Sequence, residues 1–135
     1  MPKKIPIDDR IIISIPTYEG PGIYIIRNIV NNKVYIGSAN NIHRRIKEHD
    51  YSFRKGYCNN KLQADIDLGH KFEASILENC SGMMLVEMRD REDYYVRFYN
   101  SYENGYNTAW VPVYDLNYYM KTKNQEVIQW LTRKL

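Results

Sequence analysis

The sequence lacks the features that mark secreted, membrane-spanning or disulfide-stabilised proteins. Its two cysteines, Cys58 and Cys80, form neither a CxxC pair nor a zinc-binding spacing. No apolar run approaches the roughly 18 residues of a transmembrane helix, and the start, MPKKIPIDDR, has no apolar segment of the signal-peptide type. Neither an internal repeat nor a low-complexity tract is visible. We therefore expect a protein of a reducing cytoplasm that does not enter a membrane.

The composition is otherwise that of an ordinary globular domain, apart from its tyrosines. The 135 residues suit one compact domain with an appended arm, and 44% hydrophobic and 26% charged residues are usual values. The thirteen tyrosines suit half-buried surfaces, hydrogen-bonding clefts and stacking on bases. A net charge of +3 favours an anionic partner without identifying one.

The stretch Gly22–Ser38 predicts a β-hairpin around which the rest of the chain is organised. Two runs of β-branched and aromatic residues, 23–27 and 34–37, flank the pair Asn31-Asn32. Asparagine tolerates the positive φ of a tight turn, so this pair predicts a two-residue turn.

That turn predicts which residues of the hairpin face each other. Facing positions would have numbers that sum to 63, which places Tyr35 opposite Asn28 and Tyr24 opposite Ala39. Gly37 would leave room between the two tyrosine rings. Because side chains alternate along a strand, we expect one face to carry Tyr24, Ile26, Asn28, Tyr35 and Gly37, and the other to carry Ile23, Ile25, Ile29, Val34 and Ile36.

A basic helix is predicted directly after the hairpin, from Ile42 to about Arg54. Ile42 and Ile46 share one stripe, and Arg45 and His49 share another. Residues 41–55 contain five basic and two acidic side chains, so their surplus equals that of the whole chain. Such a run is usually a solvated helix face, but its position behind the tyrosine hairpin favours a functional interpretation.

The remaining patterns predict further helices and a third strand beside the hairpin. The arm, residues 1–20, contains an apolar run at 11–15 that predicts an extra strand or a packed segment. The tail, residues 110–135, predicts a helix from Asn124 with Val127, Ile128, Leu131 and Leu135 on one side, packed on the domain, on residues 5–15 or on a second subunit. Between them we expect a short helix at 61–68, a third strand at 72–78 and a helix at 82–99.

Glu92 stands out on the last of these helices because it falls on the apolar stripe. That stripe is formed by Leu85, Met88, Tyr95 or Val96, and Tyr99. A carboxylate on a core-facing stripe is costly unless it is paired, hydrogen-bonded or bound to a cation. Position alone leaves a salt bridge to a nearby arginine and a metal ligand about equally favoured.

The order of these features closely resembles the GIY-YIG nuclease superfamily, and especially the nuclease domains of phage and intron homing endonucleases. The resemblance covers about residues 21–109, and its five separated motifs argue against coincidence. The motifs are Gly22-Ile23-Tyr24, Tyr35-Ile36-Gly37, Arg45 with His49 in NIHRRIKEH, Glu92 in REDYY, and Asn107 in NGYN.

The resemblance implies an α+β fold with a small antiparallel three-stranded sheet flanked by helices. It also implies an endonuclease that hydrolyses DNA phosphodiester bonds with one divalent ion, Mg²⁺ or Mn²⁺, held by Glu92. Arg45 would stabilise the negative charge that builds on the phosphate oxygens. Tyr24 is the base by analogy, although a phenol with a pKa near ~10 is weak at neutrality. His49 would accept its proton or hydrogen-bond to it, and Tyr35 would orient water or phosphate.

Other expectations concern the surroundings of this site. Asn107 would fix the active-site loops through hydrogen bonds. Only Cys58 or Asn59 stands where some homing enzymes have a histidine, so a second proton-transfer role has no residue. The implied partners are DNA and either a second copy of the chain or an accessory DNA-recognition protein. The candidate DNA-contacting side chains are Arg44, Lys47, Arg54 and Lys55.

These expectations describe a stand-alone phage or bacterial nuclease of homing, restriction or repair type, in the cytoplasm of a bacterial or phage-infected cell. A non-catalytic DNA-binding module on the same scaffold is the alternative. A second alternative is an interaction protein whose aromatic face binds another protein. DNA binding that weakens steeply with added salt would separate the nucleic-acid interpretations from the latter.

Overall fold

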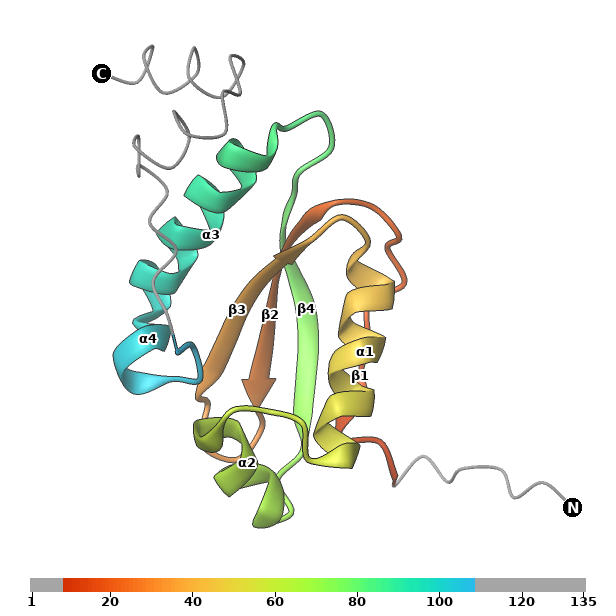
Figure 1. The fold of residues 1–135 in the computed structure, drawn as a ribbon, viewed down its shortest axis with the longest axis vertical. Helices are drawn as coiled ribbons and strands as arrows, with labels where there is room; N and C mark the ends of the chain where they lie inside the picture. Colours follow the sequence, from red (N-terminus) through yellow and green to blue (C-terminus); the bar gives the residue numbers. More distant parts are fainter. Residues whose placement is uncertain (1–8, 109–135) are drawn as a thin grey trace, which may run out of the picture.

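A four-stranded mixed sheet lies between two layers of helices in the computed structural model, which describes residues 9–108 (Figure 1). The strand order is β1-β4-β2-β3, so the first half of the predicted hairpin is a central strand. Helix α1 covers one face and α3 the other. The elements are β1 (Ile12–Ser14), β2 (Gly22–Asn28), β3 (Val34–Ala39), α1 (Ile42–Lys55), α2 (Asn60–Asp67), β4 (Phe72–Asn79), α3 (Leu85–Tyr99) and α4 (Ser101–Asn104).

The predicted fold class is confirmed, with one strand more than expected. The apolar run at 11–15 supplies β1, which pairs in parallel with β4. Asp50 of α1 holds this strand, because its Oδ1 accepts from the backbone N–H groups of Ile11 and Ile12 at 2.9 Å each. The rest of the sheet is antiparallel, as predicted, with β4 paired to β2.

The hairpin register differs from the prediction by two residues. Tyr24 lies opposite Gly37 and Tyr35 opposite Ile26, so that facing numbers sum to 61. The connection is a four-residue loop, closed by a hydrogen bond from Asn28 N to the Lys33 carbonyl at 2.8 Å. Because the side-chain period of a strand is two, this shift leaves the side chains of the paired residues on their predicted faces.

Both faces of the hairpin are buried, and they belong to two separate cores. The tyrosine face packs under α1, where Tyr24 and Ile26 are almost fully buried. The opposite face packs under α3, with Ile23, Val34 and Ile36 in contact with helix residues. The prediction that Ile29 belongs to this second face is wrong, because the residue lies in the loop and is exposed.

Side-chain caps set the helix starts on the α1 side of the molecule. Asn41 accepts from the backbone of Arg44 at the start of α1, and Gly56 ends that helix with φ 76°. Asn59 caps α2 in the same way. The C-cap of α2 is Leu68, whose side chain is exposed.

Helix α3 begins three residues later than predicted, and its apolar stripe is confirmed in part. Met88 and Val96 are buried as expected, together with Val86, whereas Leu85 and Tyr99, which we also expected on the stripe, are exposed. Leu85 is the first residue of the helix, so it lies beyond the packed turns. None of the helices between residues 9 and 108 combines the length and apolar character that crossing a bilayer needs. The predicted tail helix and residues 1–8 lie outside the described residues.

Candidate active site

Two tyrosines and a histidine meet where the hairpin passes under α1. Tyr24 of β2 and Tyr35 of β3 lie on the same face, with ring centroids 6.3 Å apart. His49 of α1 completes the group: its Nε2 is 2.7 Å from the Tyr24 hydroxyl, and its ring centroid is 5.3 Å from that of Tyr35. The structure therefore brings these three predicted residues together.

Gly37 makes this arrangement possible. A Cβ atom at this position would lie 2.4 Å from the Tyr24 hydroxyl oxygen and 2.5 Å from Cζ. The Tyr24 ring therefore occupies the space that any other residue at 37 would fill, as the sequence led us to expect. Gly37 of the second tripeptide therefore leaves the space that the ring of Tyr24, in the first tripeptide, occupies.

Burial sets the protonation state of the tyrosine–histidine pair. Loss of solvent strongly raises the pKa of Tyr24, and the nearby Tyr35 raises it further, while the Arg45 guanidinium acts in the opposite direction. Burial, helped by Arg45, lowers the pKa of His49 to about 4. The imidazole is therefore neutral near pH 7, and a neutral imidazole can accept the hydroxyl proton.

Arg45 lies beside both tyrosines while remaining open to solvent. Its positive charge lowers the pKa of Tyr24 and of Tyr35, which places the guanidinium within electrostatic reach of both hydroxyls. Its side chain is 45% exposed and forms a long ion pair with Glu48, at 3.7 Å. A half-exposed guanidinium next to an aromatic pocket is suited to bind a phosphate.

Glu92 reaches the same region from the other side of the sheet. Its carboxylate accepts a hydrogen bond from the hydroxyl of Ser38, at the end of β3. Burial raises the pKa of Glu92, whereas the Ser38 hydroxyl and the Arg89 charge lower it. Its negative charge in turn raises the pKa of Tyr35 and, to a smaller extent, of Tyr24. The arginine salt bridge that we considered does not form: among residues 9–108 no cation lies within 4.0 Å of Glu92.

The donor set around Glu92 fits a hard divalent cation that keeps most of its water. No group of three or more His, Cys, Asp or Glu side chains that suits a metal occurs in the described part of the chain. Glu92 lines a hollow together with Ser38, Asn40 and Arg89. One carboxylate beside an open, polar hollow suits Mg²⁺ or Mn²⁺, which retain several waters, and does not suit zinc.

Asn107 clamps the backbone of β3 from the end of the domain. Its Oδ1 accepts from Ile36 N and its Nδ2 donates to Ile36 O, both at 2.9 Å. The residue is buried, and Ile36 stands between Tyr35 and Gly37. The amide therefore fixes the strand that carries the second tripeptide, whereas we had expected it to fix the active-site loops.

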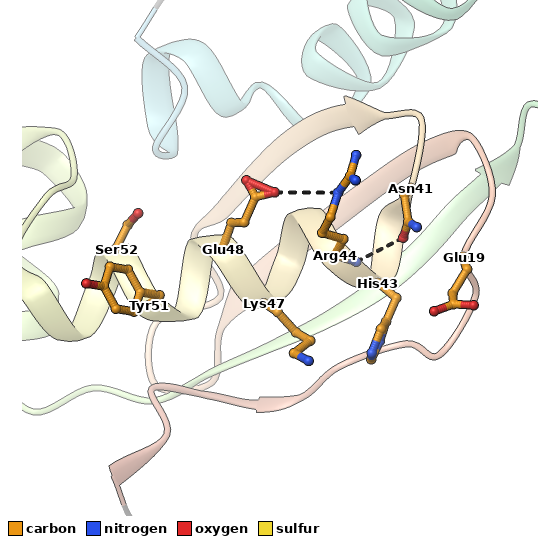
Figure 2. Close-up of a pocket in the computed structure, with 8 residues that line it drawn as sticks. All are labelled: Glu19, Asn41, His43, Arg44, Lys47, Glu48, Tyr51 and Ser52. Carbon is orange, nitrogen blue, oxygen red and sulfur yellow. Dashed lines mark hydrogen bonds and ion pairs between the residues drawn. The ribbon is translucent and has the colours of Figure 1, made fainter.

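The predicted DNA-contacting residues lie on the outer side of α1, in different surroundings. Arg44 and Lys47 line a hollow that Figure 2 shows, with His43 and Lys47 pointing toward the segment of Glu19. Arg54 forms a 3.1 Å ion pair with the buried Asp50, so it also stabilises the helix. The Lys55 ammonium lies over the Tyr51 ring at 5.7 Å. None of the tyrosines 24 and 35, His49 or Glu92 lines the hollow of Figure 2.

Sequence reasoning missed Ser38 and Arg89, which surround Glu92. Ser38 follows the second tripeptide directly, so its place at the strand end was a usable signal, whereas its pairing with α3 depends on tertiary structure. Neither candidate for the second proton-transfer role is in place for it. The Cys58 thiol donates to Gln63, and the Asn59 side chain caps α2 and bonds the Tyr106 carbonyl.

Comparisons with known proteins agree with this geometry. The GIY-YIG catalytic domain matches residues 20–107. Intron-associated endonuclease 1 of Enterobacteria phage T4 is 41% identical over 92 residues, which are 65% of this chain but only 36% of that protein. This chain thus matches little more than a third of its relative's length.

Two solved structures resemble the fold closely. One is a glutamate-to-alanine mutant of the catalytic domain of intron endonuclease I-TevI, with a TM-score of 0.63 and 39% identity over 67% of this chain and 95% of that one. The other is the catalytic domain of homing endonuclease I-TevI, with a TM-score of 0.60 and 40% identity over 66% and 98%. The predicted family is confirmed. The chain belongs to the GIY-YIG family and carries a nuclease domain homologous to those of homing endonucleases.

Proposed function

We propose that this protein is a divalent-metal-dependent DNA endonuclease that hydrolyses phosphodiester bonds. The observation that carries the proposal is the convergence, at the β3 edge, of a neutral tyrosine–histidine pair, a half-exposed arginine and a carboxylate. These are the groups that phosphodiester hydrolysis needs: a proton acceptor, a donor for the phosphate oxygens and a ligand for a cation.

Arg45 stabilises the charge that develops on the non-bridging oxygens. Attack on a phosphodiester concentrates negative charge on these atoms, and a guanidinium donates two hydrogen bonds with fixed geometry. The desolvated tyrosine pocket behind Arg45 lowers the local dielectric constant, which strengthens this interaction. The exposed side of the guanidinium leaves it accessible to the substrate.

The attacking water loses its proton through Tyr24 to His49. The Tyr24 hydroxyl donates to His49 Nε2 at 2.7 Å, which leaves its oxygen lone pairs for a water molecule. Burial disfavours a free tyrosinate, so Tyr24 passes its proton to the imidazole as it takes one from water. Tyr35, on the same face, orients the water or the phosphate.

Glu92 is the residue that would hold one Mg²⁺ or Mn²⁺ ion. GIY-YIG nucleases are generally divalent-metal-dependent, and a bound ion would polarise the phosphate and stabilise the leaving oxygen. The hydrogen bond from Ser38 orients the carboxylate and favours its charged form. Because this chain offers one carboxylate there, we expect the ion to bind well only when DNA adds its own oxygens.

The biological role that fits best is a stand-alone phage or bacterial nuclease of homing, restriction or repair type, acting in a bacterial or phage-infected cell. The phage relative supports this assignment. Arg44 and Lys47, which line a hollow on α1, would contact the phosphate backbone. Sequence selection would come from residues outside 9–108, from a second copy of the chain or from an accessory protein.

The decisive experiment incubates supercoiled, linear and branched DNA with the protein, in Mg²⁺ or EDTA, beside a Glu92→Gln variant. We expect cleavage that requires both the metal and Glu92. Undiminished cutting by the variant would overturn the metal assignment. Salt-sensitive DNA binding without any cutting would show the alternative, a non-catalytic DNA-binding module.

A further inference from the structure

A hollow of about 330 Å³ adjoins Glu92 on the side of α3. One wall is the end of β3 and the connection to α1, which contribute Ser38, Ala39 and Asn40. The other wall is the N-terminal half of α3, which contributes Leu85, Met88, Arg89 and Glu92. Both walls lie at the same end of the sheet, where α3 begins (Figure 1).

Helical periodicity explains why these α3 residues share a wall. Positions 85, 88, 89 and 92 follow the spacing of one helix face. Leu85 is 59% exposed at this surface, although it is the first apolar residue of the helix. An exposed leucine beside an arginine and an asparagine forms a site with an apolar wall and polar donors, as a nucleotide requires.

Arg89 is a cation that the described structure leaves available. It is exposed, and it forms no ion pair within 4.0 Å with any acid among residues 9–108. Its charge nevertheless acts on Glu92, so the guanidinium lies near that carboxylate. Arg91 and Arg97 on the same helix differ, because they bind Glu78 and Asp93 at 2.9 and 2.8 Å.

The spacing along α3 is of the same order as the axial rise of a DNA strand. Three residues of an α-helix advance about 4.5 Å, and the phosphates of one strand follow each other every ~3.4 Å along the duplex axis. If the scissile phosphate lies at Glu92, a side chain as long as arginine at position 89 reaches the neighbouring phosphate. The hollow then continues the DNA path away from Arg45.

We propose that this hollow binds the phosphate next to the scissile one, with the Arg89 guanidinium and the Asn40 amide as donors and Leu85 against the deoxyribose. The choice of DNA as the ligand rests on the proposed function. Arg89 and Asn40 are positioning residues in this scheme: they set the register of the strand on Glu92 and take no part in proton transfer. None of the motifs in the sequence contains either of them.

The first test measures DNA affinity without cleavage. The full chain, Arg89→Gln and the control Arg97→Gln are titrated against a labelled duplex by fluorescence anisotropy, in EDTA, over a series of salt concentrations. Loss of one phosphate contact should reduce the slope of log affinity against log salt by about 1 and weaken binding roughly tenfold. Arg97→Gln should keep the wild-type slope, and circular dichroism should show both variants folded.

The second test locates the contact. Single neutral methylphosphonates are placed at each phosphate around the mapped cut, and single-turnover cleavage is followed against protein concentration. At one flanking position the neutral group should weaken binding by wild type roughly tenfold and leave Arg89→Gln unchanged, while the saturating rate stays within about twofold. If the loss caused by the methylphosphonate and the loss caused by Arg89→Gln multiply at every phosphate position, the proposal is overturned.

The outcomes separate this proposal from the nuclease assignment. A protein that cuts DNA with an unchanged salt slope in Arg89→Gln overturns the hollow alone. If the protein binds DNA without ever cutting it, and Arg89→Gln reduces the slope of log affinity against log salt, the phosphate site in the hollow is supported and the nuclease assignment is overturned. The same slope loss in Arg97→Gln would mean that any cation on α3 suffices, which also overturns the proposal.

Discussion

The two sides of the candidate site are built in opposite ways. On the α1 side, Tyr24 is 1% exposed and its hydrogen bond to His49 lies against a packed aromatic core. On the α3 side, Glu92 is only partly buried and borders an open hollow. Burial holds Tyr24 and His49 in one protonation state. The open hollow beside Glu92, in contrast, is accessible to water, cations and substrate. In the function that we propose, proton transfer takes place on the first side and the cation binds on the second.

The largest effect that tests this comparison is the loss of the carboxylate. Glu92→Gln keeps the size and the hydrogen bond from Ser38 but removes the charge, so cleavage in Mg²⁺ should fall by roughly 10³-fold or more. DNA binding in EDTA should change by less than about threefold. Glu103→Gln, at an exposed position of α4, is the matched control and should cut normally. Equal activity of Glu92→Gln and this control would contradict the role.

Gly37→Ala attacks the buried side without removing a functional group. The new methyl would overlap the Tyr24 ring, so the hydroxyl must leave His49 or the strand must shift. We expect a loss of about 1–3 kcal/mol in unfolding free energy and roughly a 10²-fold lower cleavage rate, measured on the folded fraction. Wild-type rate and stability would show that the close packing of ring and glycine is not needed.

Asn107→Ala tests whether β3 needs its clamp. The variant leaves Ile36 N–H and C=O without two buried hydrogen bonds, which should cost about 3 kcal/mol in urea unfolding. Asn104→Ala, at an exposed position of α4, should cost little. If Asn107→Ala lost cleavage with no loss of stability, the amide would act on the substrate rather than on the strand.

The last expected effect is the pH dependence contributed by His49. Its folded pKa of about 4 lies below the unfolded value, so between about pH 6.5 and 4 the unfolded chain binds more protons. Stability from this group is complete above about pH 6.5 and is lost as pH falls through 4, by up to about 3 kcal/mol. The difference in unfolding free energy between wild type and His49→Gln should shrink over this window; a constant difference would contradict a buried neutral imidazole.

The sequence was sufficient to predict the faces of the hairpin but not its register. Alternation in residues 23–27 and 34–37 assigns faces whatever the turn, because a shift of two residues preserves them. The register depends on the loop, and Asn28 decides it: its side chain accepts from Val30 N at 2.8 Å and organises a four-residue connection. The sequence alone does not show whether an asparagine before a turn pairs with the opposite strand or accepts hydrogen bonds from the loop backbone.

The site was predictable through its motifs, and its partners were not. Tyr24, Tyr35, His49 and Arg45 were expected together, and the fold places them so. The hydrogen bond that holds Glu92 joins the end of β3 to the middle of α3, 54 residues apart. No local pattern in the sequence encodes such a contact, which is why an arginine salt bridge was equally favoured.

The central claim is that the two sides of the sheet serve one reaction, and a double-mutant cycle tests it most directly. Single-turnover cleavage is measured for wild type, Tyr24→Phe, Glu92→Gln and the double variant, in saturating protein and Mg²⁺. Because groups that act on one transition state are strongly non-additive, the double variant should cut no more than a few fold more slowly than the slower single variant. Losses that multiply in full, or a single variant that cuts like wild type, would contradict the account.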